Sequence, residues 1–288
     1  MEKVERLLPV RNQLGEGPVW RADEQALYWV DIEGKAYHRY VPATGTQERV
    51  DVGLLLGVMR FRRSGGMVMA TSAGIQFWDI QARRLTPVAN PEADKPGARF
   101  NDGAVDLQGR FWAGTMAPGV PSSALYRLDA DHSLHKIDSP IGTSNGIGWS
   151  LDGRTLYFTD SPAKTIYAYD FDPATGSAVH WRPFIHTPEE AGFPDGLIVD
   201  SQGFLWSARW GGWKISRYDP AGALERVISM PVEFPTSCVF GGADLSDLYI
   251  TSAWTNLGEQ GKDAQPWAGD IFRLHTDILG QVEPFYAG

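Results

Sequence analysis

The sequence of 288 residues contains a single cysteine, Cys238, which excludes an internal disulfide bond and a zinc site built from cysteines. It has no run of about 18 apolar residues, the length that a membrane-spanning helix needs. The first eight residues also lack the long apolar stretch of a signal peptide. We therefore predict a soluble, cytoplasmic protein.

Acidic residues outnumber basic ones, with 35 Asp and Glu and 26 Lys and Arg. The formal net charge is −9. No segment rich in Lys or Arg offsets this balance. A negative surface repels the phosphates of nucleic acids and the head groups of anionic lipids. The composition predicts neither nucleic acid nor a membrane as a partner, and it leaves the oligomeric state open.

Aromatic and turn-forming residues are abundant, with 11 Trp, 10 Tyr, 13 Phe, 32 Gly and 19 Pro. Aromatic side chains favour strands, and Gly and Pro favour tight turns. No amphipathic pattern of ten or more residues indicates a long helix. The composition therefore favours many short strands joined by tight connections.

One sequence motif recurs six times along the chain. It consists of an alternating apolar segment, a polar turn, an aromatic strand and a strand with Tyr or Phe. The motif is clearest over residues 146–170 and 196–219. Successive copies start 40, 46, 43, 50 and 42 residues apart, at Gly17, Gly57, Gly103, Gly146, Gly196 and Cys238. A repeat of this length with several short strands is typical of propeller blades.

We therefore predict an all-β protein, a six-bladed β-propeller, formed by one domain over residues 1–288. Each copy alone is a small sheet that cannot bury both faces, so the blades must pack around a ring. The alternating segment 4–10 is expected to add a strand to the last blade and close the ring, which leaves no bare sheet edge. A double-sheet sandwich is the alternative, but six similar copies fit it poorly.

A polar side chain precedes the first strand in four of the six copies. In a propeller these first strands line the axis, so equivalent positions face one another across the channel. We expect these side chains to converge at one mouth of the channel. The positions are Glu16, Asn101-Asp102, Asn145 and Asp195, with Leu56 and Ser237 in the other two copies.

Carboxylate and amide oxygens without thiolates or imidazoles predict a site for a hard cation such as Ca²⁺, Mg²⁺ or Mn²⁺. With few protein ligands, such a site would keep positions open for a substrate. The alternative interpretation is that Asn-Gly and Asp-Gly are ordinary turn dipeptides. Recurrence in register in four repeats favours the metal site.

At these residues the sequence resembles the senescence-marker/regucalcin/gluconolactonase family of six-bladed propellers. The resemblance covers essentially the whole chain, and segment 206–212 is more similar to bacterial sugar lactonases than to animal regucalcins. The phrases that carry it are Leu14-Gly-Glu-Gly-Pro-Val-Trp20, Arg99-Phe-Asn-Asp-Gly-Ala-Val-Asp106, Gly114-Thr-Met116, Ser144-Asn-Gly-Ile-Gly148 and Phe193-Pro-Asp-Gly-Leu197.

The resemblance implies metal ligands at Glu16, Asn145 and Asp195 and substrate contacts at Arg99 and Asn101. It also implies that the Asp195 carboxylate accepts a proton from the attacking water. The cofactor would be one divalent ion, with Ca²⁺ expected and Zn²⁺, Mg²⁺, Mn²⁺ or Fe²⁺ also compatible. Some relatives carry an acidic residue a few positions after Gly-Thr-Met, where this chain has Ala-Pro-Gly over 117–119, and this difference bears on substrate identity.

Our hypothesis is a metal-dependent hydrolase that opens sugar lactones to aldonic acids, with a small-molecule lactone as its partner. Two alternatives remain open, a non-catalytic metal-binding regulatory protein and a phosphotriester (organophosphate) hydrolase. An interaction platform of the WD type is disfavoured, because acids facing the channel would have no purpose there.

Other candidate residues carry weaker signals. The six histidines show no paired metal spacing, although the position of His186 before the Asp195 segment is compatible with the mouth of the channel. No Gly-x-Ser-x-Gly motif supplies a serine nucleophile. Cys238 fits a buried structural thiol. Arg209, Trp210 and Trp213 either wall the sugar site or pack between blades.

Overall fold

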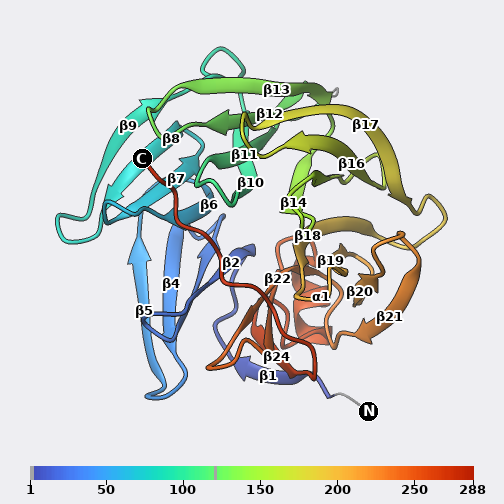
Figure 1. The fold of residues 1–288 in the computed structure, drawn as a ribbon. Helices are drawn as coiled ribbons and strands as arrows, with labels where there is room; N and C mark the ends of the chain where they lie inside the picture. Colours follow the sequence, from blue (N-terminus) through green and yellow to red (C-terminus); the bar gives the residue numbers. More distant parts are fainter. Residues whose placement is uncertain (1–2, 120–121) are drawn as a thin grey trace.

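The structure, a computed structural model, describes residues 3–119 and 122–288. Its strands form six four-stranded sheets arranged as a six-bladed β-propeller, which confirms the predicted fold (Figure 1). Every strand of the described chain belongs to one of these sheets. None of the helices in these two ranges is long and apolar enough to span a membrane.

Blades one to five are four-stranded antiparallel meanders that run from the axis outward. Blade one contains β2 (Gly15–Arg21), β3 (Ala26–Asp31), β4 (Ala36–Val41) and β5 (Thr46–Asp51), and blade two contains β6 (Leu56–Phe61), β7 (Met67–Thr71), β8 (Gly74–Asp79) and β9 (Arg84–Ala89). Blade three contains β10 (Arg99–Val105), β11 (Phe111–Met116), β12 (Ser123–Leu128) and β13 (Leu134–Ile141). Blade four contains β14 (Ser144–Trp149), β15 (Thr155–Asp160), β16 (Thr165–Asp172) and β17 (Ser177–His186), and blade five contains β18 (Phe193–Val199), β19 (Leu205–Trp210), β20 (Lys214–Tyr218) and β21 (Leu224–Ser229).

Blade six is built from both ends of the chain. It contains β22 (Pro235–Gly241), β23 (Asp247–Ser252) and β24 (Ile271–His275), with the short helix α1 (Gly258–Ala264) between the last two. Its outer strand is β1 (Glu5–Leu8), which pairs antiparallel with β24. This pairing confirms the strand predicted within residues 4–10 and closes the ring.

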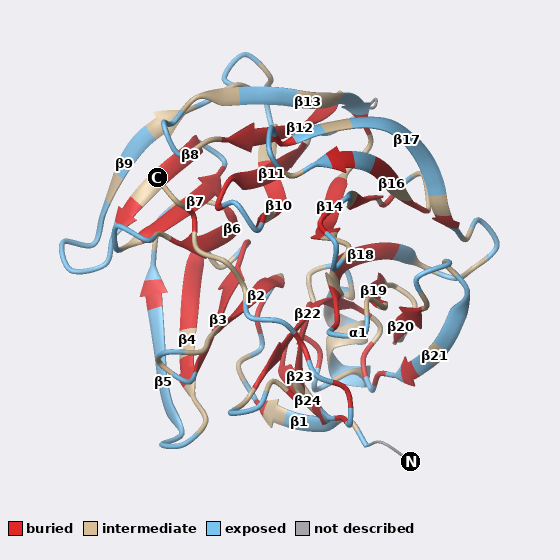
Figure 2. Cartoon of the chain, viewed as in Figure 1, coloured by how far each residue is buried: buried red, intermediate tan, exposed pale blue. Residues whose placement is uncertain are grey.

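The inner strands are largely buried, whereas the outer strands expose at least half of their residues to solvent (Figure 2). Repetition of the sequence gives repeated contacts in the core. The indole nitrogen of Trp112 donates to Asp106, and that of Trp206 donates to Asp200, six residues earlier in each case. Both indoles are fully buried, so each buried carboxylate also satisfies a buried donor.

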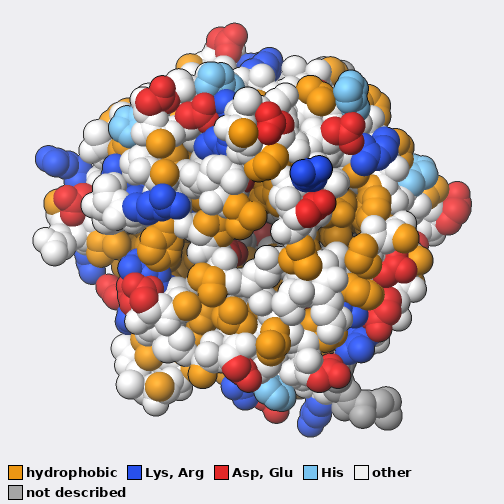
Figure 3. Space-filling view, viewed as in Figure 1, with side chains coloured by type: hydrophobic (Ala, Val, Ile, Leu, Met, Phe, Trp, Pro, Cys, Tyr) orange, Lys and Arg blue, Asp and Glu red, His pale blue; other side chains and the backbone are white. Residues whose placement is uncertain are grey.

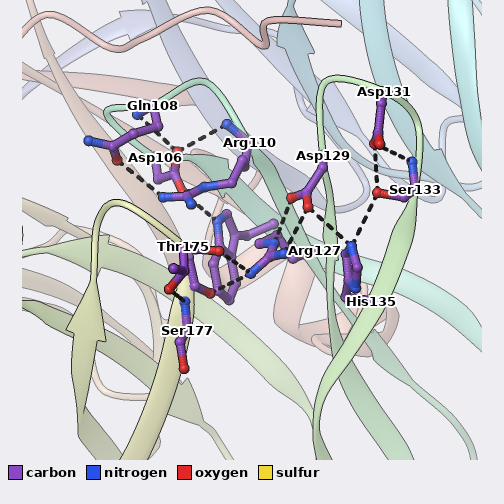
Figure 4. A network of polar contacts seen from close by, with 12 residues as sticks. Asp106, Gln108, Arg110, Arg127, Asp129, Asp131, Ser133, His135, Thr175 and Ser177 are labelled. Carbon is purple, nitrogen blue, oxygen red and sulfur yellow. Dashed lines mark hydrogen bonds and ion pairs between the residues drawn. The ribbon is translucent and has the colours of Figure 1, made fainter.

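Charged side chains connect blades three and four where the inner strands end. Figure 4 shows Arg110 paired with Asp106, just after β10, and Arg127 paired with Asp129. The two guanidinium groups also donate to carbonyl oxygens of the turn 172–177 in the next blade. This network therefore fixes blade three against blade four.

Candidate metal and active site

The predicted site residues lie where the pairing of each inner strand is irregular. In all six blades the register between the first and second strands shifts at this point, for example between Glu16 and Val19 and between Ser144 and Ile147. The same shift occurs between Pro194 and Leu197. A β-bulge bends the strand and re-aims side chains, so it can turn the polar residues of an inner strand toward the axis.

Two glycines near the start of inner strands, Gly57 and Gly146, allow adjacent inner strands to approach closely. A Cβ atom at Gly146 would lie 2.5 Å from the backbone nitrogen of Leu197 and 2.7 Å from the carbonyl oxygen of Asp195. At Gly57 it would lie 2.5 Å from the carbonyl oxygen of Phe100. The Asn-Gly and Asp-Gly pairs lie within strands β14 and β18 and are not turn dipeptides.

A chain of hydrogen bonds connects three neighbouring blades at these positions. Arg99 donates to the side-chain oxygen of Asn101 at 2.6 Å, and the Asn101 amide donates to the side-chain oxygen of Asn145 at 2.9 Å. The Asn145 amide donates to Ser161 Oγ at 2.8 Å, and Ser161 donates to the Pro194 carbonyl at 2.7 Å. The structure thus brings Arg99, Asn101 and Asn145 together beside the residue that precedes Asp195.

Ser161 is a site residue that the sequence analysis missed. It follows β15, outside the recurring position that identified the others. No pattern in its own repeat indicates its role, because only the fold brings it beside Asn145.

Two carboxylates, Glu16 and Asp195, are buried at the axis and form no ion pair within the part of the chain that the structure describes. Each accepts a hydrogen bond from the backbone N–H of the glycine that follows it. Burial and the charge of Asp102 raise the pKa of Glu16 to about 8. Burial and the charges of Glu16 and Asp102 raise the pKa of Asp195 well above its ordinary value. The metal-free protein therefore holds carboxylates that repel one another.

Asp102 lines a cavity of about 120 Å³ in the channel, together with residues near the other ends of the inner strands. Arg60 and Glu283 also line this cavity, and the charge of Arg60 opposes the rise that burial causes in the pKa of Asp102. The charge of Asp102 also raises the pKa of Glu16 and of Asp195, so this carboxylate connects the cavity with the candidate metal ligands.

The comparison with known proteins identifies the family. The sequence matches the SMP-30/gluconolactonase/LRE-like region over residues 14–254. The chain belongs to this family. This confirms the resemblance drawn from the sequence phrases.

Individual relatives match along the whole chain. A regucalcin from Danio rerio is 39% identical over 292 residues, covering 99% of each chain, and pentonolactonase XacC from Haloferax volcanii is 37% identical over 97% of each. A calcium-binding protein, regucalcin, from Agrobacterium tumefaciens has a similar structure, with a TM-score of 0.95, 28% identity and coverage of 100% of this chain and 98% of that one. A luciferin-regenerating enzyme has a TM-score of 0.92 with 30% identity over both full chains.

The donor set fits a divalent cation. Among the described residues no three His, Cys, Asp or Glu side chains are grouped as a metal cluster, and the site has two carboxylates and one amide instead. The charged groups of the channel point the same way, because four carboxyl groups face only two guanidinium groups, and a cation would relieve the repulsion among the carboxylates. The carboxylates belong to Glu16, Asp102, Asp195 and Glu283, and the guanidinium groups to Arg60 and Arg99.

Three other candidates have partners outside the proposed ligand set. His186 ends the outer strand β17, where its ring contacts Thr165, so it does not flank the mouth. Arg209 is buried and donates to Thr187 and Ala191, which fixes the loop before β18. Trp210 packs on Phe234 with 4.4 Å between ring centroids.

Cys238 lies in β22, where it is buried and borders the channel cavity, and burial raises the pKa of its thiol. A thiol with a raised pKa is a poor nucleophile. This agrees with the structural role predicted for Cys238.

Proposed function

We propose that this protein hydrolyses sugar lactones with one divalent metal ion held by Glu16, Asn145 and Asp195. The observation that carries the proposal is the pair of buried carboxylates without an ion-pair partner, beside an amide whose orientation is fixed. Buried charges are ordinarily paired or bound to a metal. A lactonase among the relatives supports the substrate class.

When bound, the cation supplies Lewis-acid polarisation of the lactone carbonyl. Arg99 and Asn101 would bind the lactone oxygens and orient the ring, since they are linked to each other and to Asn145. Asp195 would accept a proton from the attacking water while the water oxygen forms its bond to the carbonyl carbon. The ring C–O bond then breaks, and the proton returns to the ring oxygen, which becomes the hydroxyl group of the aldonic acid.

Ca²⁺ is the ion we expect, because all the proposed protein ligands are oxygen atoms. A structural neighbour described as a calcium-binding protein supports this choice. Zn²⁺, Mg²⁺, Mn²⁺ and Fe²⁺ are compatible with the same carboxylates and amide.

The test is proton release from a panel of aldonolactones, using protein stripped with chelator and resupplied with single metals. We expect metal-dependent turnover that is lost in Asp195→Asn and Glu16→Gln and kept in the control Glu225→Gln. The Glu225 carboxylate lies on the outer strand β21 and pairs with Arg217 of β20. Metal binding without turnover of any lactone would favour the regulatory alternative. Faster turnover of phosphotriesters than of lactones would favour the organophosphate hydrolase.

A further inference from the structure

A segment near the end of the chain crosses one mouth of the channel, in front of the propeller in the view of Figure 1. It is attached on one side to blades five and six, where Leu279 accepts from the Ser201 N–H at 2.9 Å and Gln281 donates to the Val199 carbonyl at 3.0 Å. On the other side the Tyr286 N–H donates to the Phe61 carbonyl in blade two at 2.9 Å. Residues 282–284 therefore bridge the axis between two anchored ends.

Glu283 in this bridge reaches Arg60 of the inner strand β6. The carboxylate lies 3.7 Å from the Arg60 Nε, and both side chains line the channel cavity with Asp102. The Arg60 side chain is only 9% exposed. Arg60 Nε and Glu283 Oε2 are buried without hydrogen-bond partners among the described residues. Figure 3 shows a hollow near the centre of this face, with hydrophobic side chains around it.

The charge of Asp102 interacts both with this pair and with the candidate metal ligands. The positive charge of Arg60 acts on both Asp102 and Glu283. The charge of Asp102 in turn acts on Glu16 and Asp195. Interactions of this kind are weakly screened in a buried channel, so they extend beyond direct contacts.

We propose that Arg60 and Glu283 are positioning residues that set the divalent-cation affinity of the channel through Asp102. This inference rests on the proposed function and deepens it. The Glu283 carboxylate offsets part of the Arg60 charge that acts on Asp102, so Asp102 keeps more of the negative field that attracts a cation. Without the Glu283 charge, the Arg60 charge would act on Asp102 without this offset. The crossing segment thus influences the metal site as well as covering the channel.

The test is calorimetric titration of Ca²⁺ or Mn²⁺ into chelator-stripped protein at one pH, with thermal unfolding measured in parallel. Glu283→Gln should weaken binding on the order of tenfold, because one negative charge is removed from a poorly screened channel. Arg60→Gln should tighten binding, because it removes a positive charge. The double variant, which has the original net charge, should bind close to the wild-type affinity.

Opposite effects of the two single variants separate a charge effect from a packing defect, which would weaken binding in both. Glu225→Gln is the matched control, because it also breaks a Glu–Arg pair but on the outer strand β21. If Glu283→Gln binds as Glu225→Gln does while the wild type binds metal, this inference alone is wrong. If the wild-type protein binds no divalent ion, the proposed function fails and this inference fails with it.

Discussion

Ser161 accepts a hydrogen bond of 2.8 Å from the side-chain nitrogen of Asn145, and this contact decides which way the amide faces. Because the nitrogen is engaged by Ser161, the amide oxygen is directed to the other side, where it accepts from Asn101. An amide oxygen has two lone pairs. One therefore remains for a cation, so Ser161 prepares Asn145 to act as a ligand.

Replacing Ser161 should impair metal binding without direct loss of a ligand. We expect Ser161→Ala to weaken divalent-cation affinity about 10- to 100-fold, the effect typical of losing a residue that orients a metal ligand. The matched control is Ser216→Ala, which removes another buried serine hydroxyl, one that has no partner among the described residues. Equal affinities of the two variants would show that Ser161 does not orient Asn145.

Arg99→Lys should separate substrate binding from metal binding. The Arg99 guanidinium donates to both the Phe100 carbonyl and the Asn101 side chain, and a lysine ammonium does not reproduce this planar geometry. We expect kcat/KM for the best lactone to fall on the order of 100-fold, because the lactone is no longer held in position. The calorimetric metal affinity should stay near that of the wild type, and a parallel loss of affinity would place Arg99 in the metal site instead.

The stability of the metal-free protein should depend on pH through Glu16. Burial and the Asp102 charge raise its pKa to about 8 in the folded state, from 4.5 in an unperturbed glutamate. Between these values the folded protein keeps a proton that the unfolded chain releases. The free energy of unfolding should therefore fall as pH rises from 4.5 to 8, by at most about 1.4 kcal/mol per pH unit from this group, and level off above pH 8.

Urea unfolding across this pH range in the presence of chelator measures the effect. Glu16→Gln should flatten the profile, and Glu225→Gln should leave it unchanged. Bound metal replaces the proton, so saturating divalent ion should also reduce the slope. A wild-type profile that stays level from pH 5 to 8 would contradict the assignment.

Gly146→Ala tests the close approach of neighbouring inner strands. The new Cβ would meet backbone atoms of Leu197 and Asp195 at 2.5 and 2.7 Å, so one strand must move. We expect a loss of about 3 kcal/mol in the free energy of unfolding, together with weaker metal binding. At Gly148 the nearest atom is a side-chain methyl of Leu197 at 2.8 Å, which can rotate away, so Gly148→Ala should cost less. Equal losses in both variants would argue against this explanation.

Much of the architecture could be predicted from the sequence because each blade is a local unit. The alternating strands, the turns and the polar residue before each inner strand repeat within about 40–50 residues, a period that identifies a propeller. The segment 4–10 could be assigned to the last blade because a ring without it would have an open edge. Glu16, Asn101-Asp102, Asn145 and Asp195 could be grouped for the same reason, since equivalent positions of a closed ring face the same axis. The choice of Glu16, Asn145 and Asp195 as metal ligands rested on the family resemblance.

The tertiary structure decided the contacts that no repeat encodes. The amide of Asn145 is oriented by Ser161, Asp102 lines a cavity with Arg60 and Glu283, and Glu283 pairs with Arg60 although the two are 223 positions apart in the sequence. Composition and periodicity determine which strands form, because those patterns depend on near neighbours in sequence. Which side chains share a buried charge depends on how the closed ring places distant residues, and that is determined only when the blades pack.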